Sequence, residues 1–319
     1  PAFGNLVPRD VASRAAKERC DKGFGVNNTG LAVFLDFSEA INRLGKDVVA
    51  QRYGNLFDMY EEITDVSPYE NPMMIYPAIH YTMGGIWVDY ELMTSIKGLF
   101  AIGECNFSDH GANRLGASAL MQGLADGYFV LPYTIQNYLA DQITVPRFST
   151  DLPEFAAAEK AVQEKIDWMM NIKGKKSVDS IHKELGHIMW EYVGMGRTAE
   201  GLKEGLKKLK EVRKEFEKEL FIPGDKEGMN VELDKAIRLY DFITMGELVA
   251  YAALNRNESC GGHFREEYQT EEGEAKRDDE NYFYVACWEY QGSDEKEPVL
   301  LKEPLVYEAI KVQTRNYKS

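Results

Sequence analysis

The sequence predicts a multidomain chain of mixed class, α/β plus α+β, that continues into a helical bundle and a small β-rich C-terminal region. Three patterns predict this order. Helical spacings and short apolar runs alternate up to about residue 150, helical spacing alone follows to about residue 257, and an alternating stretch lies near the C-terminus. The chain has 319 residues, enough for about two domains at ~150 residues each.

Residues 1–79 have α+β character. The spacing of apolar residues predicts a helix over 9–20 and a second helix from about residue 38 to residue 58. The apolar run 31–36 between them predicts a buried strand. Residues 65–77, rich in Pro, Asn and Met, predict a loop.

Residues 80–150 change to α/β character. The short apolar runs 86–89 and 98–104 predict strands, and the second ends in glycine and a carboxylate, as a parallel strand does at its functional end. The glycine-punctuated stretch 110–116 predicts a loop. Residues 117–139 predict a long apolar helix with small residues at its start.

Residues 151–257 predict an antiparallel bundle of three or four helices. In the clearest segment, apolar residues recur every three or four positions: Leu202, Leu206, Leu209, Val212, Phe216 and Leu220. Residues 258–319 predict a small β-rich region with strands over 282–288 and 302–314.

The composition argues against several classes of protein. Lys and Arg number 37 and Asp and Glu 52, and the net charge of −15 argues against nucleic acid as a partner but allows a small anionic substrate. The 4 cysteines form no CxxC pair and have no zinc spacing, which predicts free thiols and no metal site. We find no run of about 18 apolar residues and no signal peptide, so we expect a cytoplasmic chain, or one that faces the cytoplasm.

Three segments are candidates for chemistry. Residues 8–10, Pro-Arg-Asp, open a helix, where a carboxylate suits the helix dipole, so these residues alone favour a structural role. Residues 80–85, His-Tyr-Thr-Met-Gly-Gly, predict either a tight turn or a backbone that approaches a ligand closely. Residues 103–120 combine a carboxylate at a strand end, a loop that contains Arg114 and a helix N-terminus, groups suited to a ribose or ribitol hydroxyl and to anions.

These motifs stand in a familiar order and at familiar distances. Together with His-Gly-Ala-Asn-Arg-Leu-Gly at 110–116 and the Glu-Ser-Cys-Gly-Gly-His stretch that begins at Glu258, they closely resemble the flavoprotein subunit of succinate dehydrogenase and fumarate reductase. The resemblance covers essentially the whole chain. It implies that residues 1–79 are the C-terminal part of a capping domain and residues 80–150 the C-terminal part of an FAD-binding domain, with the bundle at 151–257 and the β-rich region at 258–319.

The resemblance also implies roles for individual residues. Arg9 matches the arginine that exchanges a proton with the substrate carbon, and His80 and Arg114 match the residues that hold the carboxylates of succinate or fumarate. Glu104 matches the FAD-binding glutamate. Further candidates for binding the cofactor are Tyr81, Gly103, Ser118, Ala119 and Leu120.

The chain departs from the family pattern at two positions. Ser-Ala-Leu at 118–120 stands where the family usually has Asn-Ser-Leu, which removes a side-chain hydroxyl beside the flavin. Backbone N–H groups of the helix start can still serve the flavin. Cys260 stands where arginine is usual.

One expected element is missing from the sequence. The GxGxxG fingerprint that receives the FAD pyrophosphate does not occur, so we expect this chain to be the C-terminal half of a longer polypeptide that alone holds no FAD and catalyses nothing. By resemblance, the partners are an iron–sulfur subunit and a membrane anchor subunit of cytochrome b type. The flavoprotein then lies peripherally on the cytoplasmic face of the membrane.

Other functions stay open at this point. L-aspartate oxidase has a similar loop at 110–114, although Met83 and the long C-terminal region favour the succinate and fumarate interpretation. A soluble fumarate reductase is a further enzyme alternative. A non-catalytic, partner-binding relic is the alternative of another class, but it would have no chemical need of Arg9, His80 and Arg114.

Overall fold

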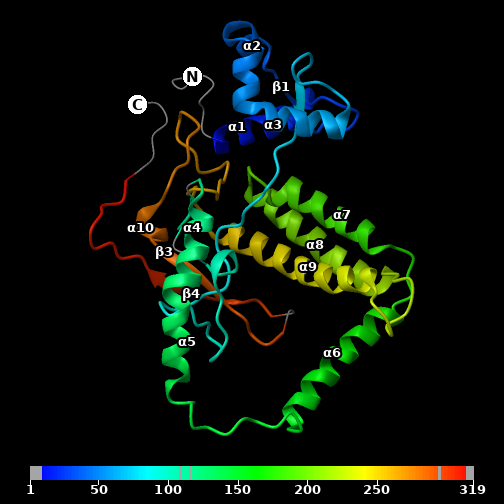
Figure 1. Ribbon diagram of the computed structural model, residues 1–319, viewed down its shortest axis with the longest axis vertical. Coiled ribbons are helices and arrows are strands. Elements are labelled where there is room, and N and C mark those ends of the chain that lie inside the picture. The colour runs from blue at the N-terminus through cyan, green and yellow to red at the C-terminus, as the bar shows by residue number, and fades with distance from the viewer. Residues whose placement is uncertain (1–8, 108–109, 115, 294–295, 314–319) are drawn as a thin grey trace. The chain divides into compact units, whose positions relative to one another are not determined.

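A computed structural model describes residues 9–107, 110–114, 116–293 and 296–313 (Figure 1). The described residues form two compact units that divide between Tyr81 and Thr82, with Gln313 assigned to the first. Pro8, Leu115 and Thr314, which belong to predicted motifs or strands, lie outside the described residues.

The helices of the first unit follow the prediction with one correction. Helix α1 (Arg9–Arg19) confirms the first predicted helix and continues into a π-helical turn, Cys20–Phe24. The second predicted helix is two helices, α2 (Ser38–Leu44) and α3 (Lys46–Thr64). Gly45 separates them because its φ of +89° is incompatible with a continuous helix.

The strands of the first unit differ more from the prediction. Strand β1 (Val33–Leu35) pairs antiparallel with β2 (Met73–Ile75), which lies in the stretch predicted as a loop. The prediction of a buried strand over 31–36 is wrong in its burial, since Phe34 is 56% exposed. The unit has a small core formed by Val49, Phe57 and Met73.

The two predicted strands at the start of the second unit are wrong. Within the described residues 82–107, the extended segments form only isolated bridges, parallel between Ile86 and Asn106 and antiparallel between Met93 and Phe100. Parallel strands are stable when neighbouring strands and helices cover them, and here Ile86 is 51% exposed. Residues 103–105 form a 3₁₀ turn instead of a strand end.

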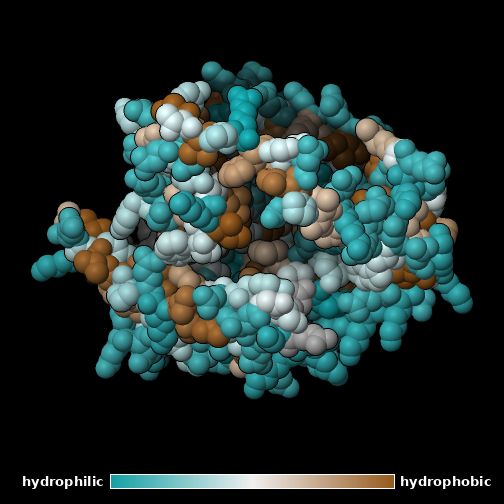
Figure 2. Space-filling model, turned by 90° about the horizontal axis from the view of Figure 1, so that it is seen from below, coloured by the Kyte–Doolittle hydropathy of each residue, from teal (hydrophilic) through white to brown (hydrophobic). Residues whose placement is uncertain are grey.

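The predicted long apolar helix is confirmed. It consists of α4 (Ser118–Ala125), a π-helical turn (Asp126–Val130) and α5 (Leu131–Ala140), which Figure 1 shows as one continuous rod. Much of its apolar surface faces solvent, as the large exposed side chains show: Leu120, Met121, Leu124, Tyr128, Phe129 and Tyr133. On the face shown in Figure 2, apolar patches interrupt a largely hydrophilic surface.

The helical region is confirmed as α6 (Pro153–Asn171), α7 (Val178–Ile188), α8 (Ala199–Glu219) and α9 (Val231–Asn255). Figure 1 shows α7, α8 and α9 side by side, and they pack through the largest core of the chain. Ser177, Thr198 and Asn230 cap the N-termini of α7, α8 and α9 with side-chain oxygens that accept backbone N–H groups. No helix among the described residues has both the length and the apolar character needed to cross a membrane.

The C-terminal region holds a short helix, α10 (Asp279–Tyr282), and an antiparallel hairpin of β3 (Tyr284–Glu289) and β4 (Val299–Pro304). The predicted second strand over 302–314 is therefore misplaced. Strand β4 starts earlier and ends at Pro304, since proline has no N–H to continue a ladder. All 4 cysteines, which lie in the described part, are free thiols.

Candidate functional site

The turn that carries Glu104, residues 103–105, is held by hydrogen bonds to the buried carboxylate of Asp126. Asp126 is 8% exposed and accepts hydrogen bonds from the Gly103 amide at 2.9 Å, from Asn106 Nδ2 at 3.2 Å and from Gln122 Nε2 at 3.0 Å. Gly103 has a φ of +68°, so the turn needs a glycine there. Glu104 itself is exposed at the turn. Asp126 was not predicted from the sequence, although a lone carboxylate inside an apolar helix indicates a buried polar contact.

The N-terminus of α4 lies in the same unit as this turn. Ala117, at the N-cap position, has a left-handed φ of +63°, and no described side chain caps the helix there. The first turn contains Ser118, Ala119 and Leu120 and no acidic residue, so its N–H groups favour a negative or electron-rich ligand. Gln122 Oε1 is buried and has no hydrogen-bond partner among the described residues.

Arg114 is half-buried in the loop before α4. Its backbone N–H donates to Met83 Sδ at 3.0 Å. Two residues earlier, the Ala112 carbonyl accepts the N–H of Gly262 at 2.8 Å. The loop is therefore attached both to the segment after His80 and to the C-terminal region, a connection that no sequence pattern predicted.

Arg9, His80 and Tyr81 belong to the first unit, whereas Gly103, Glu104, Arg114, Ser118, Ala119 and Leu120 belong to the second. Arg9 is the exposed first residue of α1, His80 is exposed and Tyr81 is half-buried. Of the two glycines at 84–85, Gly85 lies against backbone. A Cβ on it would stand 2.5 Å from the Cys105 carbonyl oxygen. Gly85 thus allows the close approach of two chain segments in the second unit.

Arg265 fixes the C-terminal signature, the stretch of residues 258–266, to the helical bundle. Its side chain is buried, with 1% of the residue exposed, and Nη1 donates to the carbonyls of Ala253 at 3.1 Å and Leu254 at 3.4 Å near the end of α9. Its Nε pairs with Glu267 at 3.2 Å. These bonds satisfy a buried charge that would otherwise be costly.

His263 is held between two partners. Arg197 Nη1 donates to Nδ1 at 2.8 Å, because a guanidinium has no acceptor, so Nε2 carries the proton and donates to the Arg256 carbonyl at 2.9 Å. Burial, together with the charges of Arg197, Arg265 and Arg256, lowers the pKa of His263 to about 4, although the hydrogen bond to the Arg256 carbonyl acts in the opposite direction. Burial, together with Arg265, lowers the pKa of Arg197 to about 10.

Cys260 is half-buried. Burial, followed by the charge of Glu258, raises the pKa of its thiol. The thiol is therefore neutral near pH 7.

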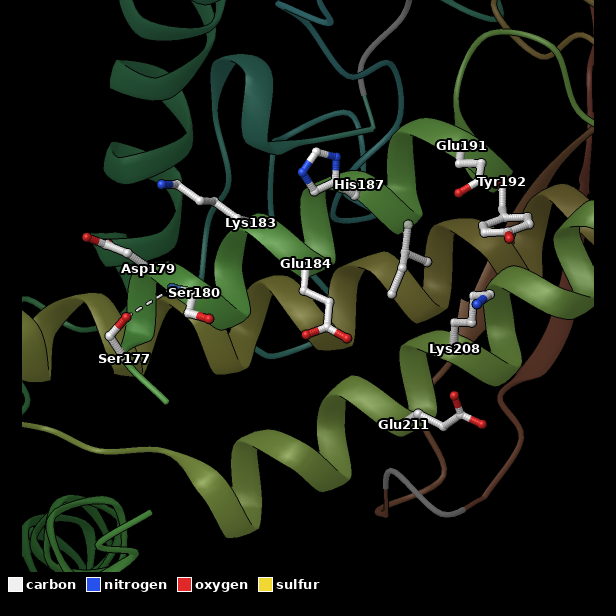
Figure 3. A pocket seen from close by; sticks show the side chains of 11 residues that line it. Ser177, Asp179, Ser180, Lys183, Glu184, His187, Glu191, Tyr192, Lys208 and Glu211 are labelled. Atoms are coloured by element: carbon white, nitrogen blue, oxygen red, sulfur yellow. Dashed lines mark hydrogen bonds between the residues drawn. The ribbon is translucent and has the colours of Figure 1, made fainter. Parts of the chain in front are cut away.

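A separate hollow of about 660 Å³ lies on the helical bundle beside α7 and α8 (Figure 3). Side chains of both signs line it, among them Lys183, Lys208, Glu184 and Glu211. None of the predicted site residues contributes to its wall. Its mixed charge gives no preference for a dianion.

The chain matches two protein families in sequence. Residues 3–120 match the family described as FAD binding domain, and residues 182–317 match the family described as fumarate reductase flavoprotein C-term.

Among curated proteins, the succinate dehydrogenase flavoprotein subunit of Bacillus subtilis is 34% identical over 269 residues, which cover 84% of this chain and 44% of that protein. The fumarate reductase flavoprotein subunit of Escherichia coli is 32% identical over 286 residues, covering 88% of this chain and 44% of that protein. The chain thus spans less than half the length of these relatives.

Solved structures agree with the sequence matches. A structure described as quinol-fumarate reductase with menaquinol molecules has a TM-score of 0.79 at 28% identity, covering 95% of this chain and 50% of that chain. Mycobacterium smegmatis Sdh1 in complex with UQ1 has a TM-score of 0.77 at 27% identity, covering 94% of this chain and 47% of that chain. Adenylylsulfate reductase from Archaeoglobus fulgidus, at 17% identity and a TM-score of 0.66, shares the fold.

Proposed function

Because this chain belongs to the succinate dehydrogenase and fumarate reductase flavoprotein family, we propose that it takes part in the interconversion of succinate and fumarate. The observation that carries the proposal is the match at both ends of the chain, together with the motif residues Arg9, His80 and Arg114. In the oxidative direction, succinate loses a hydride from one central carbon and a proton from its neighbour, and becomes fumarate.

His80 and Arg114 are the proposed carboxylate ligands. A four-carbon dicarboxylate needs two anion sites, and a guanidinium can donate two parallel hydrogen bonds to one carboxylate. The half-buried position of Arg114 supports this role, since hydrogen bonds to a carboxylate are stronger where water is partly excluded.

Arg9 is the proposed proton donor and acceptor at the substrate carbon. Arginine keeps its proton to a pKa above about 12, so a free guanidinium is a poor base. We therefore propose that Arg9 passes one proton on as it takes up another, in a relay with neighbouring groups. Its exposed place at the start of α1 leaves it accessible to a substrate.

The residues of the second unit fit FAD. The N-terminus of α4, which no described side chain caps, offers donors of the kind that a flavin needs. The exposed Glu104 and the buried Gln122 Oε1, which has no partner among the described residues, offer acceptors of the kind that a flavin and a ribitol chain need. We propose that Glu104, Gly103, Ser118, Ala119 and Leu120 hold it, with Tyr81 as a further contact. When bound, FAD supplies the hydride acceptor of the reaction. Treatment with acid tests whether the flavin is also attached covalently, because acid releases only a flavin that is not.

We propose further that the electrons pass to an iron–sulfur subunit and on to quinone through a membrane anchor subunit of cytochrome b type. The similar structures of quinol-fumarate reductase with menaquinol molecules and of Mycobacterium smegmatis Sdh1 in complex with UQ1 support the proposed link to quinone. The flavoprotein would then lie on the cytoplasmic face of the membrane through contacts with its partner subunits.

The test is an anaerobic titration of the holoenzyme that contains this chain. Succinate should bleach the flavin absorbance, and fumarate should restore it. Bleaching by L-aspartate alone would make the protein an aspartate oxidase. A flavin that responds to neither compound would contradict the proposal and favour a non-catalytic role.

A further inference from the structure

Residues 260–263 form a tight turn in the C-terminal signature. The Cys260 amide donates to the His263 carbonyl at 2.8 Å, and the His263 amide donates back to Cys260 at 3.0 Å. Ser259 Oγ, fully buried, accepts the Arg265 amide at 2.8 Å and donates to the Arg265 carbonyl at 3.0 Å. The turn is thus closed by its own backbone and braced at its base.

The base of the turn is fixed to the helical bundle. Arg265 bonds to carbonyls near the end of α9, and His263 is held by Arg197 before α8. On the other side, the carboxylate of Glu258, 2% exposed, pairs with Arg256 at 2.8 Å and accepts the Asp278 amide at 2.8 Å. Charged groups that are this well satisfied make a rigid support.

Gly261 and Gly262, at the tip of the turn, contact the loop that carries Arg114. Gly262 donates its N–H to the Ala112 carbonyl at 2.8 Å. Gly261 has a φ of +59°, and a Cβ on it would stand 1.9 Å from that same carbonyl oxygen. Only glycine allows this contact, because a Cβ at residue 261 would clash and the positive φ disfavours any other residue.

Met83 closes the contact from the other side. Its Sδ accepts the Arg114 amide at 3.0 Å, and a Cβ on Gly262 would stand 2.6 Å from its methyl carbon. The backbone of residues 112–114 is therefore fixed at both ends, at the Ala112 carbonyl and at the Arg114 amide. A fork of two hydrogen bonds to a carboxylate tolerates little displacement of the arginine that forms it.

We propose that the turn 260–263 acts with Met83 as a clamp that positions the Arg114 loop for the dicarboxylate. Gly261, Gly262 and Met83 are then positioning residues, and this inference rests on the proposed function for the role of Arg114. On this proposal, the residues around Gly261 connect the rigid helical bundle to the Arg114 loop and hold that loop in place.

The decisive variant is Gly261→Ala in the holoenzyme, with Gly273→Ala as the matched control. Both glycines have positive φ, +59° and +80°, but a Cβ on Gly273 meets only Gln269 Oε1 at 3.7 Å. We expect Gly261→Ala to weaken binding of the inhibitor malonate about tenfold or more, with flavin content unchanged and with KM raised more than kcat lowered. Gly273→Ala should bind malonate within about twofold of the parent protein. Equal malonate affinities in the two variants would overturn the clamp.

Two further measurements test the clamp without relying on the proposed function. Amide hydrogen exchange of the peptide that contains residues 110–114 should accelerate in Gly261→Ala and not in Gly273→Ala, and this readout needs no substrate. If the parent protein fails to bind malonate, the proposed function fails, and the exchange rates still decide for or against the clamp. If Gly261→Ala does not fold, Met83→Leu, which removes the sulfur acceptor at similar volume, should show the same faster exchange, and unchanged exchange would reject the proposal.

Discussion

Arg197 donates a hydrogen bond of 2.8 Å to Nδ1 of His263, so that the two side chains join the bundle to the C-terminal signature through one neutral imidazole. A positive charge on this ring would face the positive charges of Arg197, Arg256 and Arg265. The packing around His263 therefore requires a neutral imidazole, and the protein should lose stability when acid protonates it.

We expect stability to fall as the pH drops from about 6.5 to about 4. The unfolded histidine takes up a proton near its ordinary pKa of about 6.5, whereas His263 in the fold has a pKa of about 4. The unfolded state binds more protons in this window, so the contribution of His263 is complete above it and is lost within it, on the order of 3 kcal/mol. Urea unfolding of the parent and of His263→Gln at several pH values measures the slope. The exposed His187→Gln is the control and should keep the parent slope. An unchanged slope in His263→Gln would contradict the assignment.

Asp126→Asn should destabilise the turn that carries Glu104. The new amide would place an NH₂ group among the donors of Gly103, Asn106 and Gln122, and the loss of a buried charged acceptor costs about 2 kcal/mol. We expect a lower urea midpoint and less flavin per holoenzyme. Asp141→Asn, an exposed residue at the end of α5, should leave both quantities unchanged. Full flavin content in Asp126→Asn would show that this turn does not contribute to cofactor binding.

Arg9→Lys should abolish turnover, with a loss of at least ~10²-fold in kcat, while the flavin stays bound. Lysine keeps the charge but loses the planar fork that a proton relay requires. Arg43→Lys, an exposed residue of α2 that pairs with Glu39 at 3.5 Å, is the control and should remain active. Near-normal turnover in Arg9→Lys would exclude Arg9 from proton transfer.

Arg114→Lys should weaken dicarboxylate binding by about 10- to 100-fold, because one ammonium replaces a two-bond fork. The flavin spectrum during a malonate titration gives the dissociation constant. Arg147→Lys, exposed between α5 and α6, should match the parent. Equal malonate affinity in Arg114→Lys would assign the carboxylate to another residue.

The helices were largely predictable because the apolar face that packs each of them into the core recurs at helical spacing within a short stretch of sequence. Leu202, Leu209 and Phe216 recur at helical spacing and all lie in the core of the bundle. The strands were harder, since a short apolar run such as 86–89 does not reveal whether a neighbouring strand covers it. Ile86 makes a single parallel bridge and stays half exposed.

The contacts that organise the candidate site were beyond sequence reasoning for a different reason. Gly262 and Ala112 are separated by 150 positions, and a backbone hydrogen bond between them leaves no pattern in either segment. Asp126 was within reach, because one carboxylate in an apolar helix must find donors. The motif residues Arg9, His80 and Arg114 were identified by resemblance, and their roles stay predictions for the experiments above.

The solvent-facing apolar side chains of α4 and α5 also affect how the protein can be handled. Leu120, Met121, Tyr128 and Phe129 expose between 69% and 77% of their surface along one rod. Large apolar side chains exposed in this number promote self-association. A preparation of this chain alone should therefore scatter light at micromolar concentration and bind a hydrophobic dye, and a mild detergent should keep it monodisperse.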